Sequence, residues 1–174
     1  DKSFNYVVIT AEKFPAIKIV RGHELNLPKT YNLKPKTLFY GPFTSGGLLR
    51  EAMKLVRKIF PYRDERCIPA GEQLAKEKGH PAKIFEDQKL RRTKPCFNRQ
   101  IGLCPGICTG EITASDYKKS IRHIKLYFEG KKSKLVTLLK KEMKAYVREQ
   151  QFEKAQEVKK TLFALEHIQD VALL

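Results

Sequence analysis

Four cysteines are the residues of this chain with the most distinctive chemistry. They are Cys67, Cys96, Cys104 and Cys108. Their spacing is C-x28-C-x7-C-x3-C, so three of them lie close together and one lies upstream. Thiolates are the usual protein ligands of zinc and of iron–sulfur clusters. The close trio is surrounded by glycines and prolines, which favour tight turns and let the backbone approach a bound group. The sequence therefore predicts a metal or cluster site in this stretch.

The spacing leaves the identity of the bound group open. A structural zinc site usually draws on two close cysteine pairs, and only Cys104 and Cys108 form such a pair. A cubane cluster tolerates a looser arrangement, because each thiolate binds its own iron atom. The spacing is also compatible with four unlinked thiols that pack as small apolar side chains, with a disulfide, or with a catalytic thiol. His80 and His123 are near in sequence, but each is more typical of a surface or packing residue than of a catalytic base.

The charge of the chain favours an anionic partner. The 174 residues include 35 Lys and Arg against 19 Asp and Glu, which gives a formal net charge of +16. Such an excess is typical of nucleic-acid binding through counterion release, and a basic protein without such a partner is the alternative. No apolar run approaches the ~20 residues that cross a bilayer, and no secretory signal stands at the start. We therefore expect no membrane partner and a reducing, cytoplasmic location.

Hydrophobic patterning predicts an α+β fold that begins with a small antiparallel sheet. Three short runs rich in β-branched and aromatic residues are the expected strands: 6–10, 16–20 and 37–40. The first two form a hairpin signal, and Gly41-Pro42 is expected to stop the third. Thr44 or Ser45 is expected as the N-cap of a helix, in which apolar residues recur at helical spacing until Pro61 ends the run. The pattern predicts that this helix packs on the sheet.

Basic residues occupy the remaining faces of this expected helix. They are Arg50, Lys54, Arg57 and Lys58. A solvated face and a face that contacts phosphate are equally compatible with the pattern, so these residues are candidates for nucleic-acid contact. Arg91 and Arg92, shortly before Cys96, are two further candidates for nucleic-acid contact or for offsetting the negative charge of thiolates.

The second half of the chain is predicted to be helical. A helix is expected at 113–128, followed by a break at 129–131. An αα-hairpin is expected at about 133–170, capped by Ser133 and with its link at 149–151. Because this hairpin is short, we expect a partner or a second copy to cover part of its apolar surface.

These patterns divide the chain into three predicted regions. Residues 1–62 form the sheet and first helix, residues 63–112 the cysteine-rich segment, and residues 113–174 the helical region. Within the cysteine-rich segment, the stretch 68–93 is expected to be largely irregular, with a helical turn near 72–78. No phosphate-binding glycine loop and no metalloprotease motif is present, so the residues alone predict no catalytic site.

Three motifs follow one another along the chain. YGPF at 40–43 leads to Arg50-Glu51 and to FPYR at 60–63, and KPCFNRQIGLCPGIC at 94–108 follows. These motifs resemble those of UvrC, the endonuclease subunit of the bacterial excision nuclease. The run MKAYVREQQFEKAQEVKKTLFAL at 143–165 is similar to the UVR motif, a helical hairpin through which UvrC and UvrB bind each other. The motifs occur in the family's order and cover nearly all of the chain.

The resemblance implies a cofactor and a place for the chemistry. It implies a 4Fe-4S cluster on the four cysteines, with zinc as the alternative. Residues 1–62 would be the distal part of a GIY-YIG nuclease region. The catalytic residues of that nuclease, and so its divalent metal, would lie upstream of Asp1. The RNase H-like half of the family would follow Leu174. No catalytic residue is therefore assigned to this chain.

The resemblance also implies the partners. It implies a role in nucleotide excision repair, with damaged double-stranded DNA and UvrB as partners and the hairpin as the UvrB docking element. A non-catalytic nucleic-acid-binding adaptor, stabilised by zinc or a cluster, is the alternative. The chain departs from the family pattern in a longer gap before Cys96, in Ile107 where proline is usual, and in Lys160. The residues expected to bind UvrB are Met143, Phe152, Glu153, Ala155, Val158 and Leu162.

Overall fold

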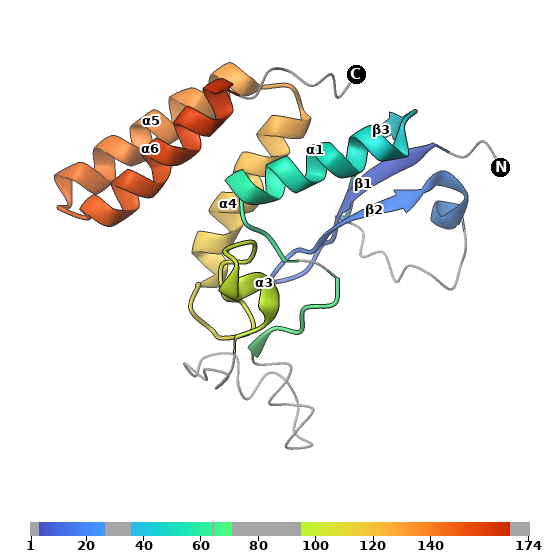
Figure 1. Cartoon of the computed structure of the whole chain (residues 1–174), viewed down its shortest axis with the longest axis horizontal. Coiled ribbons are helices and arrows are strands. Elements are labelled where there is room, and N and C mark those ends of the chain that lie inside the picture. Colours follow the sequence, from blue (N-terminus) through green and yellow to red (C-terminus); the bar gives the residue numbers. More distant parts are fainter. Residues whose placement is uncertain (1–3, 27–35, 64, 71–94, 168–174) are drawn as a thin grey trace.

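A three-stranded antiparallel sheet forms the beginning of the molecule (Figure 1). The computed structural model describes residues 4–26, 36–63, 65–70 and 95–167. The strands are β1 (Asn5–Ile9), β2 (Ile17–Arg21) and β3 (Leu38–Phe43), and their order is β2-β1-β3. The central strand β1 pairs antiparallel with both neighbours, which places Val7 opposite Ile19 on one side and Tyr40 on the other. The predicted hairpin and the α+β class are confirmed.

The third strand runs further than the sequence predicted. We expected it to stop at Gly41-Pro42, but it continues to Phe43, which pairs with Asn5. An edge strand tolerates proline, because its outer N–H groups need no partner strand. Gly41 has φ +136°, and a Cβ added there would lie only 3.0 Å from the carbonyl oxygen of Asn5. The Gly-Pro pair therefore accompanies an irregularity in the pairing instead of ending the strand.

The helix α1 (Gly46–Ile59) lies across the sheet (Figure 1). It follows a short 3₁₀ helix, η1 (Gly22–Asn26), and the strand β3. The Oγ of Ser45 accepts a hydrogen bond from the N–H of Leu48 at 3.3 Å, so the predicted N-cap is confirmed. Leu49, Met53 and Val56 are buried, because the helical spacing directs them into the common core.

A short helix, α3 (Phe97–Gln100), and a longer one, α4 (Ala114–Phe128), follow in the second half of the chain. Thr113 is the N-cap of α4, and its Oγ1 accepts a hydrogen bond from the N–H of Asp116 at 3.1 Å. Gly130, with φ +67°, supplies the left-handed conformation that follows the end of α4. The predicted helix at 113–128 and its break are therefore confirmed.

The last two helices, α5 (Lys132–Arg148) and α6 (Phe152–His167), pack along each other as a hairpin that projects from the rest of the molecule (Figure 1). The predicted link is confirmed, since Gln150 takes a left-handed conformation with φ 57° between the two helices. The predicted cap at Ser133 is wrong. The N-cap position of α5 is Lys131, two residues before Ser133, and no side chain caps the helix.

One hydrophobic core joins the sheet to the helices. It contains Val7 of β1, Val56 of α1, Tyr117 of α4, Leu135 of α5 and Leu165 of α6. The three predicted regions thus share a core in the described part of the chain, and their boundaries at 62 and 112 stay a prediction. No helix among the described residues is long and apolar enough to cross a membrane. The helical turn expected near 72–78 lies outside the described residues, and so do Arg91 and Arg92.

Candidate metal centre

The four cysteines meet in two pairs. The thiol of Cys67 shares a hydrogen bond with Cys104, and the thiol of Cys96 shares one with Cys108. The charge of the Cys108 thiolate also raises the pKa of Cys67, so the two pairs are neighbours. All four are free thiols; Cys104 and Cys108 are buried, and the other two are partly exposed. The fold thus pairs Cys67 with Cys104 and Cys96 with Cys108. No group of three or more ligand side chains in the described residues already has the arrangement of a metal site, so the metal itself stays a prediction.

Cys104 is the thiol best prepared to lose its proton. The hydrogen bond from Cys67 lowers the pKa of Cys104 to about 6, against the opposing effect of burial. The backbone N–H groups of Gly106 and Ile107 also donate to its sulfur, and the positive charge of Arg57 acts in the same direction. The same pairing raises the pKa of Cys67, and burial raises that of Cys108. A thiolate at Cys104 is therefore stabilised by several groups at once.

The turn between Cys104 and Cys108 depends on Gly106. This residue has φ +85°, and a Cβ added to it would lie 2.9 Å from Thr109 Oγ1 and from side-chain atoms of Glu111. The Thr109 hydroxyl donates to the Glu111 carboxylate at 2.6 Å, and Arg99 of α3 donates to the other oxygen of that carboxylate through Nε at 2.8 Å. Glu111 therefore fixes the turn to α3, and no other residue type fits at 106 without strain.

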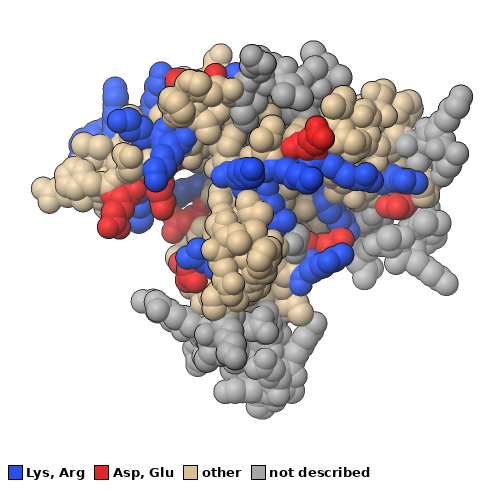
Figure 2. Space-filling view, in the orientation of Figure 1, with Lys and Arg blue, Asp and Glu red and all other residues tan. Residues whose placement is uncertain are grey.

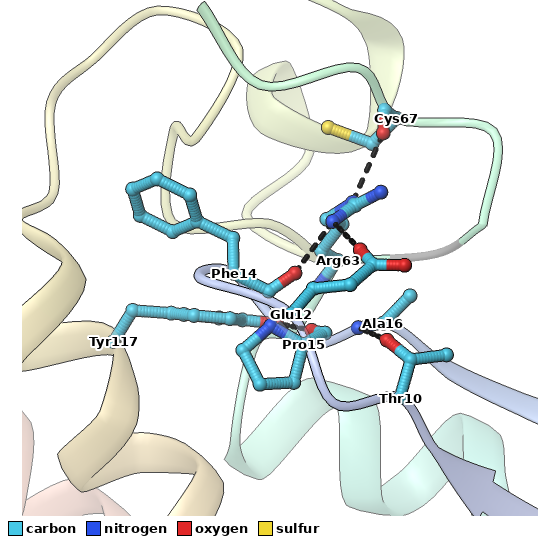
Figure 3. A network of polar contacts seen from close by, with 8 residues as sticks. All are labelled: Thr10, Glu12, Phe14, Pro15, Ala16, Arg63, Cys67 and Tyr117. Carbon is cyan, nitrogen blue, oxygen red and sulfur yellow. Dashed lines mark hydrogen bonds and ion pairs between the residues drawn. The ribbon is translucent and has the colours of Figure 1, made fainter. Parts of the chain in front are cut away.

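Arg63 holds the segment that carries Cys67 (Figure 3). Its side chain is 9% exposed, and its Nε donates to the carbonyl of Cys67 at 3.0 Å. Its Nη1 donates to the Glu12 carboxylate at 2.6 Å and to the carbonyl of Phe14 at 2.5 Å. The loop between β1 and β2 is thereby joined to the cysteine segment. On the other side of Cys67, the N–H of Ala70 donates to the carbonyl of Ile107 at 3.3 Å.

Tyr117 adds α4 to the same network (Figure 3). Its hydroxyl accepts a hydrogen bond from the backbone N–H of Arg63 at 3.0 Å and donates one to the carbonyl of Pro15 at 2.7 Å. Burial raises the pKa of the Tyr117 phenol, so it stays a neutral donor. The position of Cys67 is therefore set by two buried side chains, Arg63 and Tyr117, which bind backbone groups of segments distant in sequence.

Arg57 turns from α1 toward the cysteine segment. Its Nε donates to the carbonyl of Leu103 at 3.0 Å, and its Nη2 donates to the carbonyl of Tyr62 at 3.2 Å. Its guanidinium also lies over the Tyr62 ring, 5.0 Å from the ring centre. The sequence predicted that Arg57 contacts DNA. The structure shows it in a supporting role beside the cysteines, and a DNA contact by this residue stays a prediction.

The other basic residues predicted on α1 are exposed. Arg50, Lys54 and Lys58 all point away from the core, and Figure 2 shows a band of Lys and Arg side chains over α1. The structure therefore presents this part of the predicted DNA-binding set to solvent. Arg91 and Arg92 are not among the described residues.

The predicted docking residues of the hairpin fall into two groups. Phe152 is 64% exposed, and Glu153 beside it is exposed as well. Ala155 and Leu162 are each only 7% exposed, so they pack inside the molecule, and Met143 and Val158 are half-buried. Apolar residues that the sequence analysis did not single out are also exposed here, namely Val147 at 48% and Phe163 at 63%.

Sequence reasoning missed the residues that support the cysteines. Arg63 and Tyr62 are predicted only as part of a motif, Tyr117 only as a residue for burial, and Glu12 and Glu111 carry no predicted role. The motif FPYR at 60–63 was the one available signal for Arg63. The others act through contacts between segments far apart in sequence, which a pattern along the chain does not reveal.

Comparison with known families adds to this geometry. Residues 4–127 match the family model described as "UvrC/Cho excinuclease, middle domain". The chain belongs to the UvrC/Cho excinuclease family. A second model, the "UvrB/uvrC motif", matches residues 133–168, which include nearly all of α5 and the whole of α6. The four cysteines lie within the first match, and the hairpin makes up the second.

Individual relatives agree with the family assignment. A "UvrABC system protein C" of Synechococcus sp. is 30% identical over 97% of this chain and 23% of the relative's length. A protein of the same name from Synechocystis sp. is 31% identical over 89% of this chain and 20% of the relative's length. Another, from Moorella thermoacetica, is 30% identical over 97% of this chain and 23% of the relative's length. The chain thus spans about a fifth of the curated relatives it matches. No solved structure matches it.

Proposed function

We propose that this chain is the middle part of a UvrC-like endonuclease subunit that acts in nucleotide excision repair of damaged DNA. The observation that carries the proposal is the family match over residues 4–127, followed in order by the match to the UvrB/uvrC motif. The part played by this chain is binding and support, because no nuclease residue is assigned within it. The adaptor alternative gains no separate support from the structure.

The first element of the proposal is a 4Fe-4S cluster on Cys67, Cys96, Cys104 and Cys108, with zinc as the alternative. The donor set fits such a group, since four free thiols lie in two neighbouring pairs. Backbone N–H groups already point at the sulfur of Cys104, which is an arrangement that stabilises thiolate ligands. When bound, the cluster would join four thiolates and supply part of the folding free energy.

The protein's own residues prepare this site. Arg57 and Arg63 bring positive charge next to a group of thiols that would carry negative charge when deprotonated. Arg63 and Tyr117 position the Cys67 segment, and Gly106 permits the turn between Cys104 and Cys108. We therefore expect the site to hold the sheet, α3 and α4 together. Its role would be to position these elements for partner binding and not to catalyse a reaction.

The second and third elements are the two partners. The exposed residues Arg50, Lys54 and Lys58 would contact the phosphates of damaged double-stranded DNA. The α5–α6 hairpin would bind UvrB through the exposed ring of Phe152 and the neighbouring Glu153, because a large exposed aromatic residue is a frequent anchor of protein interfaces.

Titration of the purified chain with UvrB and with a duplex carrying a bulky lesion tests the proposal. We expect both to bind, and we expect the DNA affinity to fall steeply with salt concentration because phosphate contacts release counterions. A folded chain that binds neither UvrB nor duplex DNA would show that the proposed function is wrong.

A further inference from the structure

The outward face of α5 carries an unusual concentration of positive charge. Its cations are all exposed: Lys134, Lys140, Lys141, Lys144 and Arg148. At about 100° of rotation per residue, these five positions fall within an arc of roughly 120° of the helix surface. Leu135 and Leu139, which are buried in the core, lie outside that arc. We call this surface the α5 basic face.

No acidic residue of α5 neutralises this face. The single acid of the helix, Glu142, lies outside the arc and contacts His123 Nε2 of α4 at 3.1 Å. In the described part of the chain, none of the five cations forms an ion pair with a carboxylate. The five charges are therefore available to a partner outside this part of the molecule.

The charge pattern of α5 destabilises the helix itself. Lys140, Lys144 and Arg148 follow each other at i, i+4 and i+8, so two pairs of like charges are neighbours on one face, and such pairs destabilise a helix. The other helix of the hairpin is balanced in charge. In α6, three acids accompany three lysines, and Glu157 lies three residues after Lys154 as a neighbour of opposite charge. A solvated face needs no such repulsion, so α5 is better suited to an anionic partner than to water alone.

We propose that the α5 basic face binds the phosphate backbone of duplex DNA. From Lys134 to Arg148 the helix rises by roughly 21 Å at about 1.5 Å per residue. Along the duplex axis that length covers about six nucleotide steps, with a phosphate of one strand every 3.4 Å or so. Because each strand winds once around the duplex in about 10 steps, the straight α5 basic face contacts only a part of that run of phosphates.

The position of this surface agrees with the rest of the molecule. Figure 2 shows Lys and Arg side chains over α1 and also over the helical hairpin on the same face. The exposed ring of Phe152, the expected protein anchor, belongs to the start of α6 and not to the α5 basic face. The hairpin can thus hold DNA and a protein partner on different surfaces. This inference rests on the proposed function for its ligand, DNA, and adds the surface that binds it.

Two matched double variants test the proposal. Lys141→Gln/Lys144→Gln removes two charges from the α5 basic face, and Lys159→Gln/Lys160→Gln removes two exposed charges from α6. Binding of each variant of the 174-residue chain to an undamaged duplex is measured by fluorescence anisotropy over a series of salt concentrations. Each lost phosphate contact lowers the magnitude of the slope of log K against log salt by ~0.9. Near 0.1 M salt, such a change lowers the affinity for DNA by about 8-fold.

We expect the α5 variant to lose ~1.8 of the salt slope and roughly 60-fold in affinity, while the α6 variant changes less than about threefold. Both variants should melt at or above the parental temperature, because glutamine is a good helix former and the α5 variant relieves repulsion. Equal losses in both variants, or none in either, would overturn the inference while leaving DNA binding intact. Absence of binding by the parent would overturn the proposed DNA contact itself. A loss of binding to polyglutamate but not to duplex DNA would show that the face binds an acidic protein instead.

Discussion

Replacing Arg63 by methionine tests whether one buried side chain positions the Cys67 segment. The substitution keeps a long apolar stem and removes the guanidinium, which donates to the Glu12 carboxylate and to the carbonyls of Phe14 and Cys67. Glu12 is 38% exposed, so water can replace its partner, and its loss costs little. The carbonyls of Phe14 and Cys67 accept from a charged donor in a part-buried setting, where each such bond contributes ~1.5–3 kcal/mol.

We therefore expect Arg63→Met to lower the free energy of unfolding by about 3 kcal/mol. For a domain of this size, that corresponds to a fall in melting temperature of roughly 6–12 °C. The assay is thermal unfolding followed by circular dichroism, on apo protein and on protein reconstituted with iron and sulfide. Arg50→Met is the matched control, since Arg50 is exposed on α1, and the same change there should cost less than ~0.5 kcal/mol.

The metal content of the same preparations gives a second readout. If Arg63 positions Cys67 for the cluster, Arg63→Met should retain less iron than Arg50→Met. Arg63→Lys keeps the positive charge without the forked geometry, so it should recover part of the iron content. A melting temperature within about 1 °C of the parent, or equal losses in the two methionine variants, would refute the reasoning about Arg63.

Three further predictions follow from single residues. Gly106→Ala should destabilise the protein by more than ~1 kcal/mol, because Cβ would meet Thr109 Oγ1 at 2.9 Å with φ at +85°; a parental urea midpoint would contradict this. Thr113→Ala should cost ~1 kcal/mol through loss of the α4 N-cap, measured by urea unfolding, and Thr113→Ser should restore it. Phe152→Ala should weaken UvrB binding by ~2–3 kcal/mol in calorimetry and leave the melting temperature unchanged. Leu162→Ala, at a buried position, should lower the melting temperature. An unchanged UvrB affinity of the Phe152 variant would show that Phe152 is not in the interface.

Most of the secondary structure was predictable because local patterns decide it. Ser45, Thr113 and Gly130 mark helix ends through side-chain capping or a left-handed backbone, and both signals can be read from a few neighbouring residues. The end of β3 was not predictable in this way. Gly41-Pro42 usually interrupts a strand, but β3 lies at the edge of the sheet, and the position of a strand within a sheet is set by the whole fold.

Of the candidate site, only the four cysteines could be predicted from the sequence. Residue type and spacing identified the four cysteines, but not that Cys67 lies beside Cys104 or that Arg63 holds its backbone. The contacts of Arg63 with Glu12 and Phe14 join residues that are 51 and 49 positions apart in sequence, and packing alone brings them together.

The hairpin shows a related limit. Ala155, Leu162 and Phe152 all fit an apolar helical pattern, but only the fold shows that the first two are buried and the third is exposed. Helical spacing gives the apolar side of a helix and does not show which of its residues a neighbouring helix covers.

Iron and acid-labile sulfide in anaerobically purified protein test the central claim, that the four cysteines hold a 4Fe-4S cluster. The account predicts about four iron atoms and four sulfides per chain, and their loss in both Cys67→Ser and Cys104→Ser, because a cubane cluster takes one thiolate for each iron. Stoichiometric zinc without iron would replace the cluster by the zinc alternative. A folded protein that contains neither metal would contradict the claim of a metal centre.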